Sequence, residues 1–131
     1  MAVTFDDATR RLLDGKNFAT VATLNPDGGP HSSVVWFIRD GDAILFSTIS
    51  TRKKARNLAR DPRISVTVFE LENPYNSVEI RGSAELLDDP EKALPMRLSH
   101  RYLGIDPPAE SDEQTRLIVR VTAQKVTTFS A

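Results

Sequence analysis

Six of the seventeen lysine and arginine residues of this 131-residue chain lie within residues 47–63. Hydroxyl side chains come immediately before the first of these cations. Proteins hold phosphate with hydroxyl groups, cations and the unpaired backbone N–H groups at a helix N-terminus. The stretch therefore predicts a phosphate-binding turn, with donors from Thr48, Ser50, Thr51, Arg52, Lys53 and Lys54.

Two other interpretations of the basic stretch stay open on the residues alone. A run of charges is often one solvent-exposed face of a helix. A nucleic-acid contact is the other, but the formal net charge of -1 and the isoelectric point near 6.1 do not fit a general nucleic-acid-binding protein. We therefore expect a local anion site and no nucleic-acid partner.

A second feature is the only tryptophan, Trp36, which follows Val34 and Val35 in an apolar run. Such residues can line a flat pocket for an aromatic ring, with strand N–H and C=O groups fixing its polar edge. An aromatic residue in a strand also commonly belongs to the core, so both interpretations remain.

The composition narrows the chemistry further. The chain has no cysteine and only two histidines, which excludes thiolate catalysis and cysteine-bound metal, and we expect no metal site. Its carboxylates form no pair with an evident shared face, so no catalytic residue is assigned. The N-terminus lacks the apolar core of a signal peptide, and no run is long enough to span a membrane. We expect a cytoplasmic protein with one domain, residues 1–131.

The periodicity predicts a chain rich in strands. Apolar alternation and turn residues place six strands at residues 18–24, 31–39, 43–48, 64–70, 77–87 and 115–129, with a bulge or barrel corner at Gly82. Three short helices are expected: one capped by Thr4 and ended by Gly15, one over 52–60 capped by Ser50 or Thr51, and one opened by Asp89–Pro90, interrupted at Pro95 and ended by Gly104. Several tight turns and many strands favour a closed antiparallel barrel.

The order of these motifs resembles one family. TVATLNPDGGPHSSVVWF, a DG hairpin, FSTISTRKKARNLARDPRISV and SVEIRGSAELL are together similar to the pyridoxamine 5'-phosphate oxidase-like superfamily, over about residues 18–87. That resemblance implies a mainly β, six-stranded antiparallel split barrel that binds FMN or the deazaflavin coenzyme F420. It also implies a homodimer with the cofactor site at the subunit interface.

The resemblance assigns cofactor contacts residue by residue. The family's phosphate-holding turn matches Ser47 and Thr48 followed by Thr51, Arg52 and Lys53. The strand along the flavin ring matches Ser33, Val34, Val35 and Trp36, and a polar position near the ring or the ribityl chain matches Ser77. The deazaflavin-binding branch has an Arg-x-Lys-x-x-Asn-Leu pattern, which Arg52, Lys54, Asn57 and Leu58 match.

Two departures from the family pattern point toward the F420-dependent branch. Ser33 stands where the FMN-binding members have an arginine, and the chain ends VTTFSA in place of the substrate-binding ending of the vitamin B6 oxidases. The resemblance then implies a reductase that transfers a hydride from reduced deazaflavin to an unsaturated small molecule. An FMN-binding oxidoreductase and a non-catalytic cofactor-binding protein are the alternatives.

Overall fold

The computed structural model describes residues 2–130. Its elements follow the order α1 (Asp7–Asp14), β1 (Ala19–Leu24), β2 (Pro30–Val35), β3 (Ile38–Asp40), β4 (Ala43–Ile49), α2 (Lys53–Arg60), β5 (Arg63–Phe69), β6 (Ser77–Asp88), α3 (Ala93–Leu103) and β7 (Arg116–Phe129). All strand pairs are antiparallel and join one seven-stranded sheet in the order β2-β1-β5-β6-β7-β4-β3.

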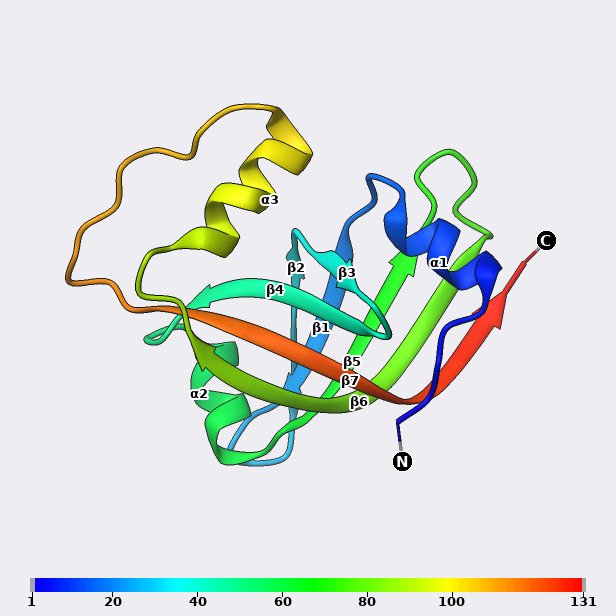
Figure 1. Cartoon of the computed structure of the whole chain (residues 1–131). Coiled ribbons are helices and arrows are strands. Elements are labelled where there is room, and N and C mark those ends of the chain that lie inside the picture. The colour runs from blue at the N-terminus through cyan, green and yellow to red at the C-terminus, as the bar shows by residue number, and fades with distance from the viewer. Residues whose placement is uncertain (1, 131) are drawn as a thin grey trace.

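The sheet is curled (Figure 1), and its two edge strands, β2 and β3, follow one another in the chain. The prediction of one strand over residues 31–39, and with it the count of six, is wrong, because this segment divides between Val35 and Ile38. β2 pairs with β1, whereas β3 pairs with β4. The short joint at Trp36 and Phe37 thus connects the two edges of the sheet.

The joint at Phe37 is held by helix α3 instead of by a neighbouring strand. The Phe37 N–H donates to the Tyr102 hydroxyl at 3.3 Å, and the Phe37 carbonyl accepts from Arg101 Nε at 3.2 Å. The Phe37 side chain is fully buried in the core. Because buried backbone groups need partners, α3 stabilises the point at which the strand divides.

The barrel interior is filled by alternate residues of the long strands. Val21, Val66, Ile80 and Val119 all lie in the main hydrophobic cluster. Gly82 marks the predicted bulge: the register between β6 and β7 shifts there, and a Cβ on this residue would lie 2.0 Å from a backbone oxygen of β7. The glycine is therefore required by the close approach of the two strands.

The helix starts differ from those expected. Asp6, not Thr4, caps α1 by accepting from the Thr9 N–H at 2.8 Å, while the helix ends at Gly15 as predicted. Helix α2 begins at Lys53, so Arg52 occupies the N-cap position, and no side chain accepts a hydrogen bond there. Neither Ser50 nor Thr51 is thus its N-cap.

Helix α3 begins later than predicted and is not interrupted. The buried Asp89 carboxylate accepts from the N–H groups of Ala93 and Leu94, each at 3.0 Å. Pro95 therefore falls in the first turn of the helix, where its missing N–H costs nothing. No helix within residues 2–130 is both long and apolar enough to cross a membrane.

Candidate functional site: an anion-binding pocket beside α2 and α3

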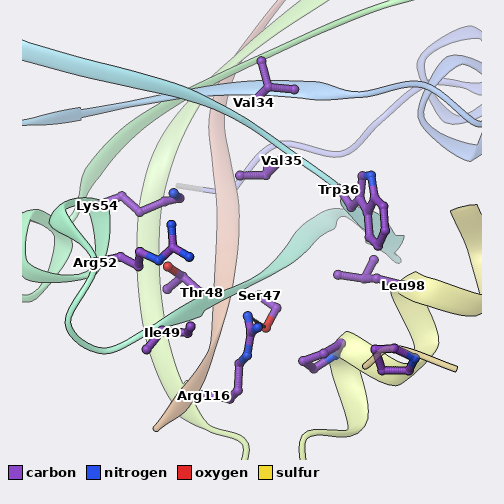
Figure 2. Close-up of a pocket in the computed structure, with 12 residues that line it drawn as sticks. Val34, Val35, Trp36, Ser47, Thr48, Ile49, Arg52, Lys54, Leu98 and Arg116 are labelled. Atoms are coloured by element: carbon purple, nitrogen blue, oxygen red, sulfur yellow. Dashed lines mark hydrogen bonds between the residues drawn. The ribbon is translucent and has the colours of Figure 1, made fainter. Parts of the chain in front are cut away.

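A pocket of about 290 Å³ lies where β2 and β4 end, between the start of α2 and the inner face of α3 (Figure 2). It brings together segments that are more than eighty residues apart in the chain. Its lining residues are Val34, Val35, Trp36, Ser47, Thr48, Ile49, Arg52, Lys54, Pro95, Leu98, Pro107 and Arg116.

One side of the pocket is cationic. Arg52 lies at the N-cap position of α2, and Lys54 is the second residue of the helix. Burial, together with the charge of Arg52, lowers the pKa of the Lys54 amine. In the described part of the chain neither side chain forms an ion pair with a carboxylate. An anion placed there would therefore relieve an unfavourable concentration of positive charge.

Hydroxyl groups lie next to these cations. Thr48 is 3% exposed, and its hydroxyl has no hydrogen-bond partner within residues 2–130. Since a buried polar group without a partner is costly, this hydroxyl is suited to a ligand atom. The Ser47 hydroxyl, on the same strand, accepts a hydrogen bond from Arg116 Nη1 at 3.3 Å.

Trp36 forms the opposite wall, and an aromatic stack supports it. The Trp36 ring lies 5.1 Å from the Tyr102 ring and 8° from parallel, and Phe18 stacks at 5.5 Å on Tyr102. The Tyr102 hydroxyl donates to the Asn17 carbonyl at 2.5 Å, which fixes the stack. Leu98 of α3 completes an apolar surface beside Trp36 (Figure 2). A flat ligand of mixed polarity fits between this wall and the cations.

Seven of the thirteen predicted cofactor residues line this pocket. They are Val34, Val35, Trp36, Ser47, Thr48, Arg52 and Lys54. These residues meet because β2, β4 and the start of α2 converge at the pocket. That they bind a cofactor stays a prediction.

The other six predicted residues lie outside the lining. Asn57 is 1% exposed and donates to Thr23 Oγ1 and Asn25 Oδ1, each at 3.1 Å, so its amide is used within the protein. Ser33 pairs with Val21 on β1, and its buried hydroxyl has no partner within the described residues. The remaining four are Ser50, Thr51, Lys53 and Ser77, the last of which pairs with Phe69 and Phe129.

Five lining residues were not predicted. Ile49 ends the same strand as Ser47, so strand alternation could have placed it on that face. Arg116 follows a long polar loop and is separated from Ser47 by 69 residues, which leaves no local signal. Pro95, Leu98 and Pro107 reach the pocket only because α3 packs over the barrel.

The residues present fit the phosphate of a flavin-type cofactor. Within residues 2–130, two cations without carboxylate partners, a buried hydroxyl without a partner and the ring of Trp36 meet in one pocket. No group of three or more His, Asp or Glu side chains that could hold a metal occurs within residues 2–130. The arrangement is therefore compatible with a cofactor of the flavin type.

The family is shown by the comparison with known proteins. A family model described as pyridoxamine 5'-phosphate oxidase matches residues 5–130. The chain belongs to this family of oxidoreductases. A curated relative, the pyridoxine/pyridoxamine 5'-phosphate oxidase of Kineococcus radiotolerans, is 32% identical over 81 residues. That alignment covers 62% of this chain and 36% of the relative, so the chain matches about a third of that protein's length.

Solved structures agree on the fold. A protein described as an F420 reductase superposes with a TM-score of 0.86 at 30% identity, covering 94% of this chain and 98% of the other. A conserved hypothetical protein from Mycobacterium tuberculosis gives a TM-score of 0.79 at 25% identity, covering 98% and 86%. General Stress Protein 26 of Bacillus anthracis, at 15% identity and a TM-score of 0.73, is similar in fold alone.

Proposed function

We propose that the protein is an F420-dependent reductase that acts on an unsaturated small molecule. The observation that carries this proposal is one pocket in which Arg52 and Lys54, with no carboxylate partner within residues 2–130, lie beside the buried Thr48 hydroxyl and across from Trp36. The similarity to a protein described as an F420 reductase, over nearly the whole of both chains, supports the same choice. When bound, the reduced deazaflavin would supply a hydride.

The chain's own residues would bind and orient. Arg52 and Lys54 would hold the phosphate through charge-assisted bonds, and the Thr48 hydroxyl would bond a neighbouring polar atom. Trp36 and the β2 residues Val34 and Val35 would support the ring. The stack of Trp36 on Tyr102 keeps that wall in one orientation, which reduces the entropy lost on binding.

An FMN-binding oxidoreductase is the second candidate, because the curated relative is a pyridoxine/pyridoxamine 5'-phosphate oxidase. Ser33 replaces the arginine of the FMN-binding members and favours F420. Titrating the protein with each cofactor, and following the fluorescence of the single tryptophan in the pocket, separates the two. We expect tighter binding of F420, and exclusive binding of FMN would overturn the choice.

We further propose that two copies of the chain associate through the outer face of β2 and β1. Val34 is 67% exposed although it lines the pocket, and its register neighbour Thr20 is uncharged. The next pair on the same face of the two strands is Ser32 and Ala22, so the side chains there are small. The cofactor site would then lie at the interface between subunits, with part of it supplied by the partner.

A charge on this face tests the dimer. Val34→Asp should convert the protein to monomers in sedimentation equilibrium, because a carboxylate would be buried without a partner. Thr127→Asp, on the exposed part of β7, provides the control and should leave the mass unchanged. A wild-type monomer at all concentrations would contradict the proposal.

A further inference from the structure

Arg116 is a pocket residue that neither the phosphate pattern nor the flat wall accounts for. It is the first residue of β7 and pairs in register with Ile49 of β4. Its side chain runs along β4 toward Ser47, and Nη1 lies 3.3 Å from the Ser47 hydroxyl (Figure 2). The guanidinium therefore faces the middle of the pocket.

Glu110, from the loop between α3 and β7, fixes the orientation of this arginine. Its carboxylate accepts from Arg116 Nη2 at 2.7 Å and from Nε at 3.1 and 3.2 Å. The same carboxylate lies 3.2 Å from Lys92 Nζ, and Lys92 also donates to the Ser111 carbonyl. The contacts of Glu110 to Nε and to Nη2 hold one edge of the guanidinium at two points.

With one edge of Arg116 held by Glu110, the remaining N–H donors of Arg116 and the net charge of the cluster are directed toward the pocket. Glu110 occupies the Nε and Nη2 edge of Arg116, so Nη1 remains directed at the pocket with Ser47. One carboxylate faces two cations, which leaves a net positive charge on this cluster. Because the Ser47 oxygen accepts from Arg116, the hydroxyl proton is available for a ligand oxygen.

This second cationic point is separate from the first. Figure 2 shows Arg52 and Lys54 together on one side of the pocket and the Arg116 guanidinium on another, beside Ser47. The lining also includes the apolar side chains of Leu98, Pro95 and Pro107. A phosphate held at Arg52 and Lys54 would leave Arg116 for another anionic oxygen on a flat molecule.

We propose that Arg116 and Ser47 bind the carboxylate of the substrate, and that the substrate class is a planar carboxylic acid whose reducible C=C bond is conjugated to that group. This inference rests on the proposed function for its reductant, reduced deazaflavin. The hydride, with its two electrons, forms a C–H bond at the carbon β to the carboxylate while the C=C π bond breaks. Negative charge moves toward the carboxylate oxygens, and water gives a proton to the α carbon.

The role of Arg116 in that step is electrostatic. Its donors are already oriented by Glu110, so they need no rearrangement as charge develops on the oxygens. A neutral amide in place of the carboxylate would lose the charge-assisted bonds to the cluster. Binding should therefore discriminate between an acid and its amide.

Calorimetric titration of the full chain with cinnamate and with cinnamamide tests the inference. We expect the wild type to bind the acid about tenfold or more tightly than the amide, and Arg116→Gln to remove that preference. The matched control is Arg120→Gln on the same strand, whose side chain pairs with Asp40 at 2.8 Å and does not line the pocket. It should keep the preference.

A second variant and a second ligand complete the test. Ser47→Ala, which leaves the Arg116–Glu110 pair in place, should lower the affinity for cinnamate a few-fold. Affinity for F420 should be unchanged in Arg116→Gln. If that affinity falls tenfold while the preference for the acid persists, the anion at Arg116 belongs to the cofactor and the inference is wrong. Absence of any acid preference in the wild type also overturns it. Failure of both F420 and FMN to bind would instead overturn the proposed function and leave the acid preference standing.

Discussion

The two ends of the basic stretch, residues 47–63, use their cations in opposite ways. At the start of α2, Arg52 and Lys54 face a pocket and form no ion pair within the described residues. At its end, Arg60 donates to the Leu24 carbonyl, and Arg63 pairs with Asp61 at 2.7 Å. Charge density is therefore a poor guide to function here, and the presence or absence of a protein partner is a better one.

Asn57, which lies between the two ends, holds helix α2 in place on the barrel. Asn57 bonds to β1 and to the turn that follows it, and Arg60 reaches the Asn57 amide oxygen at 3.4 Å. The C-terminal half of α2 thus anchors the helix to the barrel, so that its N-terminal half can present cations without partners.

The largest expected effect comes from removing both cations of the pocket. Arg52→Ala combined with Lys54→Ala should weaken cofactor binding by a few kcal/mol, because two charge-assisted bonds to phosphate are lost. The measurement is a fluorescence titration with F420. Arg56→Ala combined with Arg63→Ala removes the same charge from outside the pocket lining, keeps Arg60 in place, and should leave the affinity nearly unchanged. Equal losses in both double variants would remove the distinction between the ends.

Removing the anchor should lower stability. Asn57→Ala leaves Thr23 and Asn25 without their buried donor, which should cost about 1–3 kcal/mol in the free energy of unfolding. Urea denaturation measures it. A variant as stable as the wild type would show that the amide network does not hold the helix.

A smaller effect of opposite sign is expected at Lys54. Lys54→Met removes a half-buried cation that Arg52 repels, and because solvent screens part of this repulsion the unliganded protein should gain at most about 0.5 kcal/mol of stability while losing cofactor affinity. Urea denaturation and cofactor titration of the same preparation measure the two changes. Loss of stability would mean that the amine has a favourable role in the free protein.

The pH dependence of stability checks the same residue. The folded pKa of Lys54 lies below its ordinary value of 10.5, so between the two values the unfolded chain binds more protons than the folded one. The contribution of Lys54 to stability should therefore rise with pH across that window, and this rise should be absent in Lys54→Met. Cofactor affinity should fall in the same window, because the amine loses its charge.

The smallest effect is expected at the exposed ion pair. Arg63→Ala should leave the free energy of unfolding nearly unchanged, because both partners of the Arg63–Asp61 pair are solvent-accessible. The same denaturation assay applies. A large loss would place Arg63 among the anchors of the helix.

Local patterns predicted much of the fold. Alternation gave strands within one or two residues of β1, β4, β5, β6 and β7, and the bulge was placed at Gly82. The division at Trp36 and Phe37 was missed because apolar residues continue across it. What divides the strand is Tyr102 and Arg101, some 65 residues later, which supply partners for the Phe37 backbone.

The site was predictable only where it is contiguous in the chain. The residues of β2, β4 and the α2 start that line the pocket come from two short runs with visible composition. Asn57 matched a family pattern and yet its amide is used inside the protein. Arg116 and Glu110 lay in a polar stretch whose local composition matches any exposed loop, and only the pairing of β7 with β4 brings them to Ser47.

The pairing of β4 with β7 has a consequence for how the molecule is made. The two strands contribute Ser47 and Arg116 to one pocket, so that part of the pocket closes over a long loop of chain. Contacts of such large sequence separation form slowly, after the hairpins of neighbouring strands. During synthesis, the cationic start of α2 leaves the ribosome well before the strand that completes the pocket. Ligand binding thereby becomes a property of the finished chain.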